Sequence, residues 1–146
     1  MKTAKCGLFL WARTMDVFHY YGGDLSVSSS GDLAVADQST TGVQRVYRRL
    51  LTNPQLNNVT GTAVASGDYT AHPTYGAGLP RKVGSPQSIA STEALIKGQM
   101  YLESVVTRNP APTITLTPVN NVLSAAIQYQ DANTSTPQFL EFDITK

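Results

Sequence analysis

The side chains best suited to acid–base chemistry are few and widely spaced in this chain of 146 residues. Its three glutamates are Glu93, Glu103 and Glu141. Glu93 and Glu103 fall within one predicted helix, where ten intervening steps would place them about 15 Å apart. The paired carboxylates of glycosidases stand only ~5–10 Å apart. We therefore expect both glutamates to be solvated on the helix surface.

The remaining reactive side chains form no recognisable motif. His19 and His72 are isolated from each other and from Cys6, the single cysteine, so neither a metal-ligand spacing nor a disulfide is possible within the chain. His72 precedes Pro73, where a structural hydrogen bond is the expected role. The serines lack a nucleophile elbow, and the glycines lack a phosphate-binding loop. The sequence predicts no catalytic residue, no metal site and no cofactor.

Composition indicates one domain with an unusually uncharged surface. Hydrophobic residues make up 41% of the chain and charged residues only 14%, with a net charge of +1. Low charge suits packing among other subunits, although a neutral soluble domain would have the same composition. The net charge argues against nucleic acid or an anionic membrane as a partner. The apolar run from Gly7 to Ala12 is too short for a bilayer span, so we expect synthesis in the cytoplasm, with this run packed on the body or on a partner.

A strongly two-faced helix is predicted over Gly42–Thr52. Its apolar stripe has the helical spacing i, i+3, i+4, i+7 and i+8 and consists of Val43, Val46, Tyr47, Leu50 and Leu51. Residues 39–41 offer N-cap oxygens, and Asn53–Pro54 ends the helix. Three arginines occupy the other side: Arg45, Arg48 and Arg49. They form either a solvated face or a partner-binding face, and the sequence leaves both open.

A turn-dense segment follows this helix. Residues 53–66 have the composition of an exposed loop, with a small hairpin expected around Gly61. Residues 67–80 are rich in Gly, Pro and Tyr and nearly uncharged. We interpret this second stretch as a fixed connection whose structural signature is made by Pro73, Tyr75, Gly76, Gly78 and Leu79.

The remaining elements predict an α+β fold. An N-terminal hairpin is expected from residues 24–27 and 32–35, and a second helix from Ser85–Pro86 to about Ser104. The last third alternates polar and apolar residues in three stretches: 113–117, 122–130 and 139–144. Short links between them predict an antiparallel three-strand meander, with the two helices covering one face of the sheet.

Several of these segments together resemble the baseplate-wedge, or sheath-initiator, family of contractile phage tails. They are residues 31–35, the helix through Arg45 to Thr52, residues 67–69 and, above all, His72-Pro-Thr-Tyr-Gly-Ala-Gly-Leu79. The resemblance covers about residues 24 to 144, which makes 1–23 an N-terminal arm and 24–146 a single domain. Residues 53–66 would be an insertion, because in family members the helix is followed directly by the segment that corresponds to Gly67-Asp-Tyr69.

The resemblance implies a non-enzymatic role in tail assembly. Family members sit on the baseplate around the tail tube and offer a sheet edge for strand exchange with the first sheath ring. The implied partners are the tail sheath protein, the baseplate wedge proteins and tube or hub proteins, with several copies, six expected, around the tail axis. The implied location is the baseplate of the virion tail.

The resemblance also assigns contact residues. The sheath-contacting strand would be Gln138, Phe139, Leu140, Glu141, Phe142, Asp143 and Ile144. The wedge-contacting residues would be Arg45, Arg48, Arg49, Arg108, Asn109 and Pro110. Family members tend to carry Glu-Pro-Arg after the second helix, and this chain retains an arginine and a proline there in a different order, which makes Arg108 the best candidate for that contact.

Two other classes of function remain as alternatives. One is a lysozyme-like enzyme of the baseplate that degrades the cell wall, which the lack of a close carboxylate pair disfavours. The other is a small stand-alone binding domain.

Overall fold

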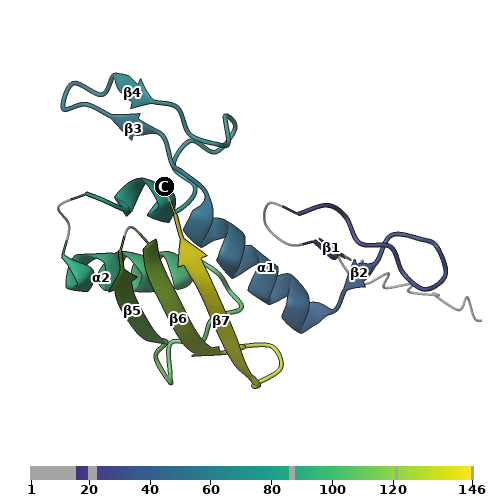
Figure 1. The fold of residues 1–146 in the computed structure, drawn as a ribbon. Helices are drawn as coiled ribbons and strands as arrows, with labels where there is room; N and C mark the ends of the chain where they lie inside the picture. Colours follow the sequence, from purple (N-terminus) through teal and green to yellow (C-terminus); the bar gives the residue numbers. More distant parts are fainter. Residues whose placement is uncertain (1–15, 20–22, 86–87, 121, 146) are drawn as a thin grey trace, which may run out of the picture.

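The computed structural model describes residues 16–19, 23–85, 88–120 and 122–145. Its C-terminal sheet is an antiparallel meander of β5 (Thr113–Val119), β6 (Val122–Gln130) and β7 (Pro137–Ile144), in that spatial order. Two helices, α1 (Gln38–Leu51) and α2 (Ile89–Met100), lie on the same face of this sheet (Figure 1). The α+β fold and the meander predicted from the sequence are confirmed.

The core fills the space between the sheet and the two helices. Alternate strand residues face inward, so that Leu116, Ala125 and Phe142 form one cross-strand row and Ile127 and Leu140 form the next. The helices contribute side chains with no exposed surface: Val46, Leu50, Ile96 and Met100. Burying one such side chain is worth about 1.5–3 kcal/mol, so this layer is the main source of stability.

Helix α1 begins four residues earlier than predicted, at Gln38. Its N-cap is Asp37, whose Oδ1 accepts a hydrogen bond from the Thr40 amide at 2.7 Å. This hydrogen bond lowers the pKa of the exposed Asp37 carboxyl. The predicted cap residues 39–41 instead lie within the helix. The prediction was wrong because apolar periodicity starts only at Val43, whereas the cap lies one and a half turns before it.

The C-terminus of α1 is capped by residues 67–80, the tight loop. Thr52 is the C-cap, and the Arg49 and Thr52 carbonyls accept hydrogen bonds from the amides of Ala77 and Gly78, each at 2.9 Å. These carbonyls have no partner within the helix, so the loop supplies it. Gly76 has a φ of 109°, and a Cβ there would stand 2.1 Å from the Thr52 oxygen. Only glycine fits this approach.

The other signature residues hold the same loop in place. Leu79, with no exposed surface, is in the core and opens a short 3₁₀ helix, η1 (Leu79–Lys82). The exposed Pro73 accepts a hydrogen bond from the Gln55 amide at 2.7 Å through its carbonyl. At His72 the structural hydrogen bond is also made by the backbone, whose oxygen accepts from the Tyr75 amide.

Helix α2 is shorter than predicted. It begins after the N-cap Ser88 rather than Ser85, and it ends at Met100 rather than near Ser104. Pro86, the expected first helical residue, lies outside the described residues. Residues 101–106 form turns, because Val105 and Val106 fold back into the core and Val106 forms a bridge with Asp131.

Two small two-stranded units lie outside the main sheet (Figure 1). The first pairs β1 (Asp16–Val17) with β2 (Val35–Ala36), and the expected hairpin is present next to it as a bridge between Val27 and Leu33. The second pairs β3 (Leu56–Asn57) with β4 (Ala63–Ala65), which confirms the expected hairpin around Gly61. The second unit stands away from the sheet in Figure 1.

Candidate functional site

Strand β7 is an edge strand, and its outer backbone groups have no partner strand within the described residues. Asp131 lies opposite Thr136 and donates its amide to the Thr136 oxygen at 2.9 Å. Hydrogen-bonded and non-bonded pairs alternate in an antiparallel ladder. Phe139, Glu141 and Asp143 therefore turn their N–H and C=O groups away from β6, toward the open side.

The side chains at these three positions are exposed on the sheet face opposite the helices. Phe139 keeps 69% of its surface accessible. Leu140, Phe142 and Ile144, the other half of the predicted sheath-contacting strand, are buried in the core and turn their amides toward β6. The predicted strand thus divides into a structural half and an available half.

The opposite edge of the sheet is less suited to strand addition. Thr107 donates its amide to the Gln130 oxygen at 3.1 Å. The backbone N–H and C=O groups of even-numbered β6 residues therefore point toward β5. By the same alternation, Pro118, opposite Leu123, has its nitrogen on the outer edge of β5. Proline has no N–H to offer, and natural edges use it to prevent pairing. The predicted strand ended at Thr117, so Pro118 fell outside it, whereas β5 continues to Val119.

A groove of ≈ 270 Å³ runs between the outer edge of β7 and the neighbouring helix α1. One wall is residues 139–142 of β7. The other is made by α1 and the first described segment: Val43, Gln44, Tyr47, Arg48, Phe18 and His19. The Tyr47 and Phe142 rings meet edge to face at the groove, with centroids 4.9 Å apart. An extended segment lying in the groove would meet backbone groups on one side and both apolar and polar side chains on the other.

A small polar network includes three residues that line the groove: His19, Gln44 and Arg48. Arg48 Nη2 donates to His19 Nε2 at 3.0 Å, and His19 Nδ1 lies 3.1 Å from the Val17 oxygen. His19 Nδ1 also lies 2.9 Å from Gln44 Nε2. Gln44 Nε2 also donates to the Val17 oxygen at 3.1 Å. The network attaches residues 17–19 to α1, and sequence reasoning missed it because the partners lie 25 or more positions apart.

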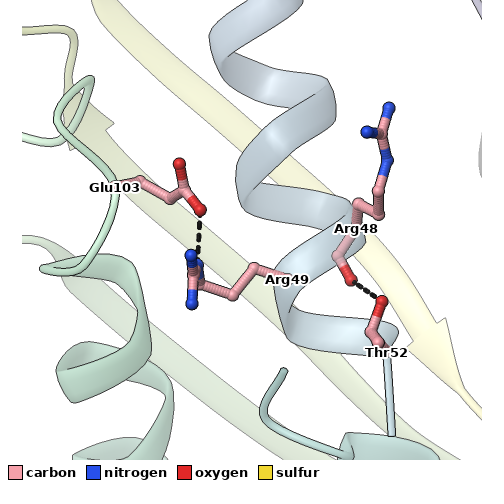
Figure 2. Close-up of polar contacts among 4 residues, drawn as sticks. All are labelled: Arg48, Arg49, Thr52 and Glu103. Carbon is pink, nitrogen blue, oxygen red and sulfur yellow. Dashed lines mark hydrogen bonds and ion pairs between the residues drawn. The ribbon is translucent and has the colours of Figure 1, made fainter. Parts of the chain in front are cut away.

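The side chains of the three arginines of α1 do not form one common surface. Arg45 is exposed, whereas Arg48 and Arg49 are half-buried and point in different directions (Figure 2). Arg49 forms an ion pair with Glu103, in the turn after α2 (Figure 2). The side chains of this pair are only 15% and 12% exposed. The expectation that Glu103 is solvated on a helix surface is therefore wrong.

Arg49 also joins the pair to the tight loop. Its guanidinium carbon lies 4.3 Å from the centre of the Tyr75 ring, and Tyr69 packs edge to face on Tyr75 at 5.5 Å. Burial is the main reason that the pKa of Tyr75 is raised. Arg49 thus connects α1, the turn after α2 and the tight loop, which is a structural use of a side chain predicted to be solvated or partner-binding.

The predicted contact at residues 108–110 lies on a different element from Arg45. Arg108, Asn109 and Pro110 are exposed in the connection between α2 and β5, and the Asn109–Pro110 peptide bond is cis. The Arg108 guanidinium lies 5.5 Å from the centre of the Tyr101 ring. Arg45 and the 108–110 turn are available surface, whereas Arg49 is committed to the interior pair.

Two other kinds of feature, a metal site and a membrane-spanning helix, were sought in the part of the chain that is described. No three His, Cys, Asp or Glu side chains gather there as a possible metal site. None of its helices is long and apolar enough to cross a membrane.

Comparison with family models, with curated proteins and with solved structures finds no match for this chain.

Proposed function

We propose that this protein is a non-enzymatic component of a contractile phage tail baseplate. In this role it attaches to wedge proteins and initiates sheath assembly, because the outer edge of β7 accepts a strand from the first sheath ring. Wedge attachment would use the exposed Arg45 and the turn at Arg108–Pro110. The protein would be made in the host cytoplasm and act in the baseplate, in several copies around the tail axis.

The observation that carries this proposal is the asymmetry of the two sheet edges. At β7 the backbone groups of Phe139, Glu141 and Asp143 face outward beside a groove, whereas Pro118 interrupts the outer edge of β5. A strand that adds to an edge gains main-chain hydrogen bonds, and neighbouring pockets select its alternate side chains. That the added strand comes from the sheath protein is inferred from the sequence resemblance.

Glu141→Pro tests the proposal with little risk to the fold. The Glu141 amide faces outward, so proline there removes no hydrogen bond to β6, and edge strands tolerate proline at such positions. We expect folded Glu141→Pro protein to incorporate into baseplates and to reduce sheath assembly at least about tenfold, the effect of losing roughly 1.4 kcal/mol of edge pairing. The measurement is the fraction of baseplates bearing sheath in negative-stain images.

Glu141→Thr is the matched control, because it removes the same carboxylate and retains the amide. It should assemble sheath normally. Equal sheath assembly with Glu141→Pro and wild type would disprove the proposal. Phe142→Pro is unsuitable for this test, since its amide points toward β6 and its side chain is buried.

A further inference from the structure

Arg48 is a half-buried cation that lines the groove beside β7, and no Asp or Glu side chain of this chain neutralises it. All ten Asp and Glu residues of the sequence are among the described residues. Within that part of the chain the one ion pair joins Arg49 to Glu103, and Figure 2 shows the Arg48 side chain pointing away from both. Arg48 Nη2 donates to His19 Nε2 at 3.0 Å, an acceptor without negative charge.

The acidic side chains that come closest to the groove along the chain are turned to other surroundings. Glu141 and Asp143 of β7 are exposed on the sheet face opposite the helices, whereas Arg48 belongs to α1 on the helix side. Asp16 Oδ1 accepts a hydrogen bond from the Val17 amide at 3.0 Å. An added strand would therefore meet positive charge on its helix side and negative charge on its other side.

A strand that covered Arg48 with apolar side chains would take the guanidinium out of water without a counter-charge. A buried charge without a partner is strongly unfavourable, whereas one that meets an opposite charge and a hydrogen bond is tolerated. Elsewhere the helix wall of the groove includes the apolar Val43 and Tyr47. The occupant that fits this wall is acidic where it meets Arg48 and apolar next to that position.

Two contacts show which part of β7 lies beside Arg48. Near the start of α1, Ser39 Oγ donates to Thr134 Oγ1, in the turn before β7, at 3.4 Å. Further along both elements, the Tyr47 and Phe142 rings meet at 4.9 Å. Helix α1 and strand β7 therefore run in the same direction, side by side (Figure 1). Arg48 directly follows Tyr47, which places it beside the second half of β7.

We propose that the strand added to β7 carries an Asp or Glu side chain opposite Phe142, and that this carboxylate pairs with Arg48. Residues opposite each other share a face of the sheet, so this side chain faces α1 as Phe142 does. The next inward side chain, opposite Leu140, is apolar and faces Val43. Arg48 thereby sets the register, because a slip of one residue turns the carboxylate to the acidic outer face. Only the source of the strand, the sheath protein, rests on the proposed function.

Two capped peptides measure the preference for a carboxylate in the full protein. The first is acetyl-Lys-Val-Thr-Glu-Thr-Val-Lys-amide, which reads the same in both directions, so the test does not depend on strand direction. The second has Gln in place of Glu. Amide NMR shifts of Phe139, Glu141 and Asp143 during titration give the dissociation constants. We expect wild type to bind the Glu peptide about tenfold more tightly than the Gln peptide, as for a charge pair at an interface.

Two variants with the same change of charge show whether Arg48 is responsible. Arg48→Met removes the cation in the groove, whereas Arg45→Met removes an exposed arginine of the same helix that does not line it. Arg48→Met should bind both peptides alike, and Arg45→Met should retain the tenfold preference. If Arg48 only held residues 17–19 through His19, Arg48→Met would weaken both peptides equally and keep the preference, which would overturn the proposal.

Three other results would also reject it. They are equal affinity of wild type for the two peptides, binding of neither peptide, and equally tight binding of the Glu peptide and of a Gln peptide with an uncapped C-terminus. The last result would assign the groove to a chain terminus instead of a side chain.

Failure of this inference can be distinguished from failure of the proposed function. Normal sheath assembly on Arg48→Met baseplates, with little on Glu141→Pro baseplates, would reject the carboxylate contact and leave sheath initiation intact. A tenfold preference for the Glu peptide in a protein whose Glu141→Pro variant assembles sheath normally would support the carboxylate site and reject the sheath strand as its occupant.

Discussion

Replacement of Gly76 by alanine should destabilise the fold by about 4 kcal/mol or more, the range of the most damaging single substitutions. Two costs combine at this position. The φ of 109° is strained for any residue with a Cβ, and the added Cβ would stand 2.1 Å from the Thr52 oxygen. Either the tight loop or the C-terminus of α1 must move, and the movement breaks hydrogen bonds from Ala77 and Gly78 to the α1 carbonyls. Urea-induced unfolding measures the change.

Two other glycines provide controls for that experiment. Gly84 has a φ of 75° but no atom within 4 Å of an added Cβ, so Gly84→Ala should cost only the conformational part, about 1–2 kcal/mol. Gly98 lies in α2 with open space around it, so Gly98→Ala should stabilise by about 0.5–1 kcal/mol. If Gly76→Ala costs no more than Gly84→Ala, the loop is not the fixed connection described above.

Glu103→Leu should destabilise by about 3 kcal/mol, because it leaves the Arg49 guanidinium mostly buried without its carboxylate. The matched single variant is Arg49→Met, which leaves the carboxylate unpaired instead. The double variant Arg49→Met with Glu103→Leu removes both charges and should be far closer to wild type than the sum of the single variants. Urea unfolding of the four proteins gives the coupling energy.

A coupling energy near zero would contradict the account of this pair. The two single changes would then add, as they do for distant residues. Arg49 and Glu103 would then both be solvated, which the sequence predicted for Glu103 and left open for Arg49. Tyr75 gives an independent readout, since its ring packs against the Arg49 guanidinium. Its near-ultraviolet circular dichroism should change in Arg49→Met.

Local signals explain how much of the fold the sequence predicts. The strand at residues 122–130 was bounded correctly because alternation runs through its whole length and a turn signal precedes it. The end of α1 was predicted to within one residue, because the residue before Pro54 disfavours the helical conformation. The starts of both helices were misplaced, since Asp37 and Ser88 cap them outside the apolar pattern.

Contacts between distant residues explain what the sequence missed at the site. Arg49 and Glu103 are 54 positions apart, and no periodicity relates them. The same holds for Arg48 and His19, 29 positions apart. The meander prediction did place residues 139–144 at a sheet edge, because consecutive strands with short links have the last strand outermost. Which half of β7 is available became clear only from its register with β6.

The most direct test of the account is an image reconstruction of the intact contractile tail by electron cryomicroscopy at a resolution that separates strands. We expect this chain on the baseplate, with density for an additional strand from the first sheath ring along Phe139, Glu141 and Asp143 of β7. A chain found elsewhere in the tail, or a β7 edge that no sheath strand meets in the assembled tail, would contradict the account.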